Sequence, residues 1–195
     1  MAQRALILAS GSPRRRQLLG QLRLPLEVIP SRAEEPPFTG GSPQSYCLEN
    51  AILKAQEVAE RYPGRFILGA DTVVILGGVA LGKPRDREHG AEMLRALSDR
   101  PHIVATAFAL ISPDGSVHSE VVETTVFIKA LREWEIQGYL ETGEPDDKAG
   151  AYAIQGIGTF LVAGIEGSYS NVVGLPVMEV LGALEAAGGP RPFQH

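Results

Sequence analysis

Short apolar runs that alternate with helix-start signals restrict most strongly how this chain of 195 residues can fold. Residues 5–9 (ALILA) form one such run, which is bounded by polar residues and predicts a buried strand. Ser12 followed by Pro13 predicts that a helix begins there, because Ser is a favoured N-cap and Pro fits the first helical turn. Ser42 followed by Pro43 repeats this signal. Such alternation of strands and helices is typical of α/β proteins.

The remaining runs predict further strands and helices. Strands are expected at residues 26–29, 66–69, 72–76, 79–81, 102–111, 117–128 and 160–165, and helices at residues 42–62, 86–97 and 132–140 and from residue 176. Residues 31–43 and 143–158 are rich in Gly, Pro or polar side chains and are expected to be loops. Because no repeat and no long linker divides the chain, we predict one α/β domain over residues 1–195, with a mixed twisted sheet and flanking helices.

Composition and charge exclude several classes of protein. Apolar residues make up 44% and charged residues 21% of the chain, which is ordinary for a soluble globular protein. The formal net charge of −5 argues against a nucleic-acid binder, which usually carries a basic face. The first apolar run is too short for a signal peptide, and no stretch reaches the roughly 18 apolar residues of a membrane helix. We therefore expect a cytoplasmic protein that binds neither nucleic acid nor membranes.

Two single residues are interpreted as packing residues. Cys47 is the only cysteine, so an intramolecular disulfide is excluded, and its apolar helical surroundings predict a small buried side chain and not a nucleophile. Trp134, at the start of a predicted helix, is expected to be partly buried.

The strand-to-helix junction at residues 10–15 (SGSPRR) is the first candidate site. A helix N-terminus presents unpaired N–H groups and a partial positive charge, so it binds anions readily. Ser10 and Ser12 can add hydroxyl donors, while Arg14 and Arg15 can clamp phosphate oxygens. The sequence contains no Walker A motif. The alternative is a capped surface helix whose arginines are solvated.

A carboxylate that ends an apolar strand is the second candidate. Asp71 follows residues 66–70 (FILGA), and a carboxylate at such a strand end can hold a divalent cation or activate water. Glu34 and Glu35 in the early loop could supply further metal ligands, and Lys54 and Lys83 could neutralise phosphate charge. The alternatives are a turn aspartate that binds backbone N–H groups, solvated glutamates and two surface lysines.

The third candidate is the segment at residues 146–156 (DDKAGAYAIQG). Its small residues allow close approach of the backbone, and the amide of Gln155 can both donate to and accept from the edge of a base. A loop of this length inside a compact domain usually signals function. The alternative is a mobile surface loop.

Together these segments resemble the Maf family of nucleotide pyrophosphatases over nearly the whole chain. The motifs that carry the resemblance are, in chain order, LASGSPRRRQLL, SRAEEP, ENAILK, LGADTVV, LGKPRD, DKAGAYAIQG and GSYSNVVGLP. The resemblance implies an inosine-triphosphatase-like α/β fold with a cleft between two lobes. It also implies a nucleoside triphosphate substrate, which is hydrolysed to the monophosphate and pyrophosphate with the help of a divalent metal cation, magnesium or manganese.

The resemblance also implies roles for individual residues. Asp71 matches the family's catalytic acid, which accepts a proton from the attacking water, and Glu35 matches an acidic position near the metal, so that Glu35 and Asp71 are the expected metal ligands. Positions that match the family's substrate-contacting residues or its prominent lysines are Ser10, Arg14, Arg15, Lys54, Thr72, Lys83 and Gln155. Of these, Arg14, Thr72 and Gln155 match positions that the family links to substrate choice.

The DKAGAYAIQG version of the third segment resembles the branch of the family that acts on dTTP and UTP. Ala153, where Gly is frequent in the family, and the third arginine, Arg16, are mild departures that remove no reacting group. Two other functions remain as alternatives: the branch that prefers 7-methyl-GTP, and a nucleotide-responsive regulator of cell division. A homodimer is an assembly that the sequence leaves open.

Overall fold

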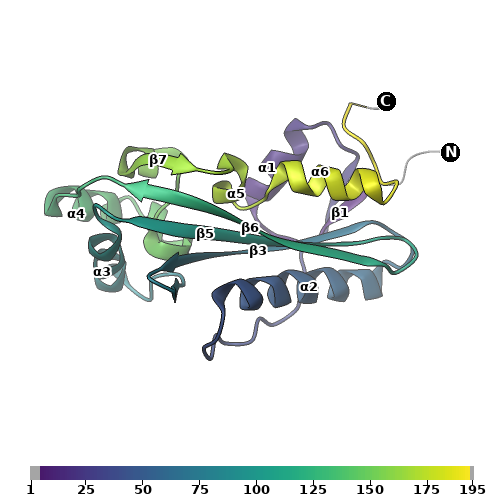
Figure 1. Cartoon of the computed structure of the whole chain (residues 1–195), viewed down its shortest axis with the longest axis horizontal. Helices are drawn as coiled ribbons and strands as arrows, with labels where there is room; N and C mark the ends of the chain where they lie inside the picture. Colours follow the sequence, from purple (N-terminus) through teal and green to yellow (C-terminus); the bar gives the residue numbers. More distant parts are fainter. Residues whose placement is uncertain (1–4, 194–195) are drawn as a thin grey trace. The chain divides into compact units, whose positions relative to one another are not determined.

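The computed structural model describes residues 5–193, and its strands form one mixed sheet (Figure 1). The strands are β1 (Leu6–Leu8), β2 (Leu26–Val28), β3 (Ile67–Leu76), β4 (Val79–Leu81), β5 (Pro101–Ile111), β6 (Val117–Ile128) and β7 (Val162–Glu166). The strand order is β2-β1-β3-β5-β6-β7, and β4 pairs with β3 outside this path. β1 runs parallel to β2 and β3, whereas β3 with β4 and β6 with β7 are antiparallel.

The helices alternate with the strands, which confirms the predicted α/β class. They are α1 (Pro13–Gln21), α2 (Pro43–Arg61), α3 (Arg87–Leu97), α4 (Glu133–Glu141), α5 (Tyr169–Val173) and α6 (Val177–Ala186), together with the short 3₁₀ helices η1 (Glu144–Asp147), η2 (Ala149–Ala151) and η3 (Gly156–Leu161). The predicted helix starts are correct. The side chains of Ser12, Ser42 and Asp86 accept hydrogen bonds from the first turns of α1, α2 and α3.

The chain divides into two compact units that each combine separate segments. The first unit contains the described residues up to Asp71, then Thr106–Val122 and the residues from Gly174 onward; the second contains Thr72–Ala105 and Glu123–Val173. Boundaries between the two units fall within β3, β5 and β6, so each of these three strands contributes residues to both units. The single domain over residues 1–195 stays a prediction.

The core of the first unit follows from the alternation of side chains along its strands. Leu68 and Ala70 of β3 point into an apolar core with α1 and α6, so Ile67, Gly69 and Asp71 point to the other face. Figure 1 shows α2 on that other face. This core contains Leu6, Leu8, Leu19, Leu68, Phe108, Leu110, Val180 and Leu184.

The core of the second unit is built mainly by α3, α4 and the inner faces of the strands. It contains Val74, Leu94, Leu97, Val126, Ile136, Tyr139, Leu140, Tyr152 and Leu161. Tyr152 lies in the segment expected to be a loop, so part of that segment is core and not exposed chain.

Four expectations about local structure need correction. Residues 66–76 were expected as two strands, but β3 is continuous, so Asp71 lies inside a strand and not at its end. Pairing with β1 at one end of β3 and with β4 at the other holds the backbone extended through this position. Residues 143–158 were expected to be a loop but contain 3₁₀ turns. The last of these, η3, extends to Leu161, so β7 begins at Val162 and not at residue 160. The short helix α5 was not predicted.

The prediction of a packing role is confirmed for Cys47 and wrong for Trp134. Cys47 is fully buried, as expected, and burial raises the pKa of its thiol to about 12, so it is a protonated core side chain. Trp134 is 68% exposed, which contradicts the expected packing role. It lies in the first turn of α4, whose buried residues are Glu135, Ile136, Tyr139 and Leu140.

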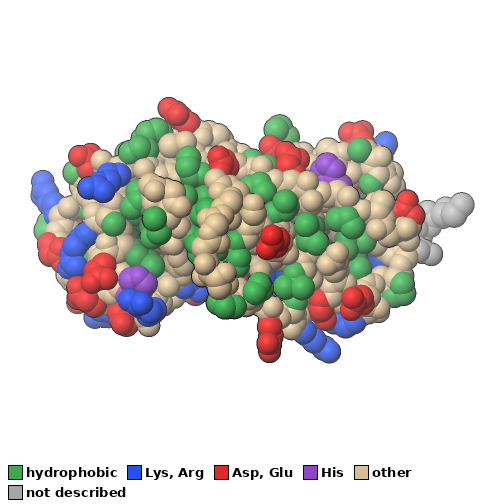
Figure 2. Space-filling view, turned by 60° about the horizontal axis from the view of Figure 1, so that its bottom comes forward, with side chains coloured by type: hydrophobic (Ala, Val, Ile, Leu, Met, Phe, Trp, Pro, Cys, Tyr) green, Lys and Arg blue, Asp and Glu red, His purple; other side chains and the backbone are tan. Residues whose placement is uncertain are grey.

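The surface shown in Figure 2 mixes both signs of charge. On that face, Lys and Arg side chains lie among Asp and Glu side chains and form no continuous basic stripe. This distribution agrees with the net charge of −5. Across residues 5–193, every helix is too short or too polar to serve as a membrane span.

Candidate active site

The junction of β1 and α1 holds Ser10 and Arg15 in fixed positions. Ser10 is buried, and its Oγ accepts hydrogen bonds from Ser12 N–H at 3.2 Å and from Arg15 Nη1 at 3.2 Å. Arg15 Nε donates to the carbonyl of Gly174 at 2.7 Å. Arg15 is therefore anchored to the protein and is not the solvated arginine of the alternative interpretation.

The electrostatic surroundings of Arg15 are mixed. Burial lowers the pKa of its guanidinium and the neighbouring charge of Arg14 acts in the same direction, whereas the carboxylates of Asp71 and Glu35 oppose the shift. An arginine stays protonated at neutral pH even so. Arg15 thus supplies a fixed positive charge close to Asp71, and the partly exposed Arg14 lies beside it.

Three charged side chains from separate segments meet on one face of the first unit. Lys54 Nζ of α2 donates to Asp71 Oδ1 of β3 at 2.8 Å and lies 2.7 Å from Glu35 Oε1. The side chains of Lys54 and Asp71 are 14% and 15% exposed, whereas Glu35 is 48% exposed. The lysine and the carboxylates are therefore mutual partners, and for Lys54 the surface-lysine alternative is wrong.

Gly69 explains how the helix comes close enough to the strand. It lies two residues before Asp71 on the same face of β3, and a Cβ there would stand 2.3 Å from Ala51 O and 2.8 Å from Ala55 N. Because these are backbone atoms of α2, a side chain at this position would push the helix away. Gly69 therefore sets the distance between the strand of Asp71 and the helix of Lys54.

The carboxylates of Glu35 and Asp71 fit a cation that is shared with a substrate better than one caged by protein. Both converge on one positive group, Lys54 Nζ. Among the residues that the structure describes, no three His, Cys, Asp or Glu side chains gather as a metal site. Magnesium commonly takes one or two carboxylates and completes its shell with phosphate oxygens and water. The pair is compatible with that kind of site.

The other predicted residues, Thr72, Lys83 and Gln155, belong to the second unit. Thr72 follows Asp71 in β3 and is partly exposed. Lys83 is exposed, and the preceding Gly82 accepts a hydrogen bond from Gly150 N–H at 3.0 Å, which joins the Lys83 segment to the segment of Gln155. Gln155 is partly exposed between the buried Tyr152 and Gly158.

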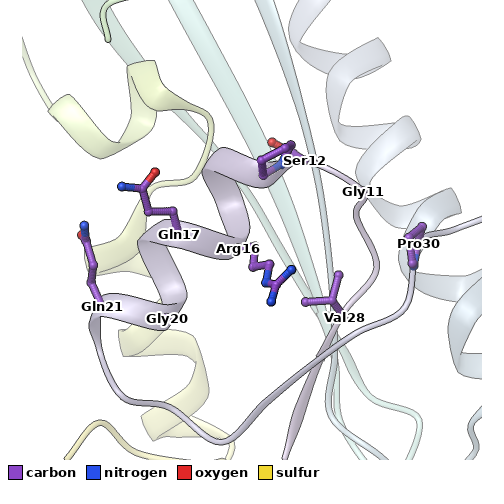
Figure 3. A pocket seen from close by; sticks show the side chains of 9 residues that line it. Gly11, Ser12, Arg16, Gln17, Gly20, Gln21, Val28 and Pro30 are labelled. Atoms are coloured by element: carbon purple, nitrogen blue, oxygen red, sulfur yellow. The ribbon is translucent and has the colours of Figure 1, made fainter. Parts of the chain in front are cut away.

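A surface hollow lies elsewhere in the first unit, on the side of α1 that carries Arg16. Figure 3 shows Arg16 pointing from the helix toward Val28 of β2, with Ser12 and Pro30 near the upper end. Asp71 and Lys54 do not line this hollow. The charged cluster, and not this hollow, therefore marks the candidate active site.

Sequence reasoning missed two kinds of supporting group. In the sequence, Gly69 stands out only as part of the LGADTVV motif, although a glycine inside an apolar strand is a known signal of close backbone approach. The carbonyl of Gly174 lies 159 residues from its partner Arg15, and nothing in the local sequence of either residue indicates the contact.

Comparison with known proteins identifies relatives along almost the entire chain. A family model described as "Maf-like protein" matches residues 5–187. A Myxococcus xanthus protein named dTTP/UTP pyrophosphatase is 50% identical over 194 residues, covering 98% of this chain and 97% of its own. A Syntrophotalea carbinolica protein of the same name is 46% identical over 191 residues, covering 96% and 87%.

Among solved structures, the Ham1 protein of Staphylococcus aureus is similar with a TM-score of 0.50 and 18% identity, covering 81% of this chain and 79% of that one. At this identity the likeness shows the fold alone. The family match and the identity to the curated relatives do not depend on it, and they show that this chain belongs to the Maf-like protein family.

Proposed function

We propose that this protein hydrolyses dTTP and UTP between the α and β phosphates and releases the nucleoside monophosphate and pyrophosphate. The observation that carries the proposal is the pairing of Asp71 with Lys54 close to the anchored Arg15. This arrangement combines a proton acceptor with positive charge for a phosphoanhydride. Relatives that are 45–50% identical and named dTTP/UTP pyrophosphatase support the substrate.

The proposed chemistry is attack of water on the α-phosphorus. The new bond joins the water oxygen to that phosphorus, the bond to the bridging oxygen breaks, and pyrophosphate leaves. Asp71 accepts the proton of the attacking water. Ser10, Arg14, Arg15 and Lys54 bind the phosphate oxygens, whose charge must be stabilised as the leaving group departs.

Glu35 and Asp71 are the proposed ligands of a magnesium or manganese ion. When bound, such an ion would neutralise phosphate charge and hold the triphosphate. Lys54 pairs with both carboxylates, which keeps them close together.

The second unit supplies the proposed selection of the base and one further positive charge for the phosphates. Lys83 neutralises phosphate charge, Thr72 contributes to substrate choice, and the amide of Gln155 pairs with the edge of the pyrimidine base. A site built on such hydrogen bonds rejects a base that leaves its polar groups unpaired. We further propose that the protein acts in the cytoplasm, where nucleoside triphosphates are used, and that a homodimer is the assembly to test.

The test is product analysis with dTTP, UTP, ATP, GTP and 7-methyl-GTP, with and without magnesium. We expect pyrophosphate and monophosphate from dTTP and UTP, with kcat/KM about tenfold or more above ATP and GTP. In H₂¹⁸O the label should enter the monophosphate and not pyrophosphate. Preferred turnover of 7-methyl-GTP would assign the protein to the other branch, and binding of nucleotide without turnover would favour a regulator.

A further inference from the structure

The backbone on both sides of Gln155 is fastened to two side chains of the second unit. Glu144 Oε2 accepts from Ile157 N–H at 2.9 Å, and Glu144 Oε1 accepts from Gly158 N–H at 2.8 Å. On the other side of Gln155, Tyr139 Oη accepts from Ala153 N–H at 3.1 Å. We refer to residues 153–158 as the Gln155 loop and to Glu144 and Tyr139 as its clamp.

The two members of the clamp are themselves joined. Tyr139 Oη donates to Glu144 Oε1 at 2.9 Å, so one hydroxyl and one carboxylate connect both ends of the loop. Burial disfavours the charge of Glu144, but hydrogen bonds from the Gly158 and Ile157 N–H groups and from Tyr139 outweigh it and lower the pKa of the carboxyl. Burial together with the Glu144 contact raises the pKa of Tyr139, which therefore remains a donor. The clamp is thus intact at neutral pH.

Two glycines allow the loop to approach the clamp this closely. Gly156 has a φ of +73°, and a Cβ there would stand 2.4 Å from Glu144 Oε2. A Cβ at Gly158 would stand 2.5 Å from Tyr139 Oη and 2.4 Å from Ala153 O. The loop therefore lies directly on the clamp, and Gln155 is carried by backbone that is fixed at three N–H groups.

We propose that Glu144 and Tyr139 are positioning residues that set the selectivity for pyrimidine over purine triphosphates by holding the Gln155 loop. This inference rests on the proposed function, in which Gln155 contacts the base. Neither clamp residue needs to touch the nucleotide. A loop released from the clamp would let Gln155 adjust to either kind of base, so discrimination would fall while the Lys54–Asp71 pair of the first unit keeps its contact.

The experiment compares kcat and KM for dTTP and ATP in the wild type, Tyr139→Phe and Glu144→Gln. Tyr139→Phe removes the hydroxyl but keeps the ring, which packs edge-on to Phe160 with centroids 6.0 Å apart. In both variants we expect the dTTP-to-ATP ratio of kcat/KM to fall about tenfold, and kcat for dTTP to change less than about threefold.

Glu133→Gln is the matched control, because it makes the same substitution in the same unit. Glu133 begins α4 and pairs with Arg95 at 2.6 Å on the surface. It should leave the ratio unchanged. A purely structural role for the clamp would lower the folded fraction and reduce turnover of both nucleotides equally, which also leaves the ratio unchanged.

The outcomes separate this inference from the function on which it rests. A wild-type ratio near one would overturn the pyrimidine preference, and with it the inference. A wild type that prefers dTTP, with clamp variants that keep that preference or lose both activities equally, would overturn the inference alone. A reduced ratio with kcat for dTTP retained is the result that we expect.

Discussion

The two units hold their candidate functional residues in different ways. In the first, Glu35, Lys54 and Asp71 come from a loop, a helix and a strand and meet through ionic contacts within 2.8 Å. In the second unit, the candidate residue Gln155 has an uncharged side chain, so ionic contacts cannot hold it. Its neighbours are fixed instead through backbone N–H groups that donate to Glu144 and Tyr139.

This difference matches two separate tasks. A cluster of opposite charges can stabilise phosphate and move a proton, and it acts on the part that all nucleoside triphosphates share. A shaped backbone loop can distinguish one base from another, but it supplies little charge. We therefore expect damage to the charged cluster of the first unit to reduce turnover of every nucleotide, and damage to the Gln155 loop of the second unit to change the preference among them.

Removal of divalent metal should have the largest effect. We expect chelation with EDTA to abolish turnover of all nucleotides, because the triphosphate charge is then left to Arg and Lys alone, and we expect added magnesium or manganese to restore it. Pyrophosphate release before and after metal addition measures this. Full turnover in metal-free buffer would show that Glu35 and Asp71 serve another purpose.

Asp71→Asn should be next in size. It keeps the shape but removes the charge that Lys54 contacts, and we expect turnover to fall about a hundredfold or more on every nucleotide, on the scale of general acid–base catalysis. Asp114→Asn, in an exposed turn of the same unit, is the control and should keep its activity. Near wild-type turnover in a folded Asp71→Asn protein would remove Asp71 from the mechanism.

Gly69→Ala should weaken the first unit through geometry alone. The added Cβ would press on the backbone of α2, which overpacks the core and costs about 1–3 kcal/mol of unfolding free energy. The displaced helix carries Lys54, so turnover should fall equally on all nucleotides. Gly20→Ala is the control, since a Cβ there meets no atom within 4 Å. Denaturant unfolding and kcat are measured on both variants. A Gly69→Ala protein with the stability and turnover of the wild type would contradict this role of Gly69.

The sequence alone predicted the class of fold and most elements because their signals are local. Ser-Pro caps and apolar runs specify structure within a few residues, and the helices and strands begin close to where they were expected. The continuity of β3 through Asp71 was missed because it depends on pairing with β1 and β4.

The candidate site was predictable only in part, for the same reason. The motifs named Lys54 and Asp71, but their contact depends on how closely α2 packs on β3. The clamp on the Gln155 loop joins side chains that lie 13 or 14 residues from their backbone partners, and no propensity or periodicity indicates such a contact.

The unfolding free energy should depend on pH through one buried histidine of the second unit. His102 is buried, with Nε2 2.7 Å from Tyr152 Oη, and burial lowers the pKa of its imidazole from 6.5 to about 4. Between pH 6.5 and about 4, His102 is therefore protonated in the unfolded chain but not in the folded chain. This effect removes stability as the pH falls from 6.5 to 4, by about 3 kcal/mol in total.

His102→Gln keeps a hydrogen-bonding side chain but cannot titrate. We expect the unfolding free energy of this variant to fall less steeply over that pH range than that of the wild type, while the two curves run parallel above pH 7. Urea unfolding at several pH values measures the difference. Parallel curves down to pH 4 would mean that His102 is protonated in the folded protein.

The central claim is that the charged cluster of the first unit performs the chemistry and the Gln155 loop of the second unit selects the base. It is tested most directly by kcat/KM for dTTP, UTP, ATP and GTP in the wild type, Asp71→Asn and Gln155→Ala. We predict that Asp71→Asn lowers all four values by one common factor. Gln155→Ala should bring the pyrimidine-to-purine ratio about tenfold closer to one and keep most of kcat for dTTP. Equal efficiency on purines and pyrimidines in the wild type, or an equal loss on all four in Gln155→Ala, would contradict this division of tasks.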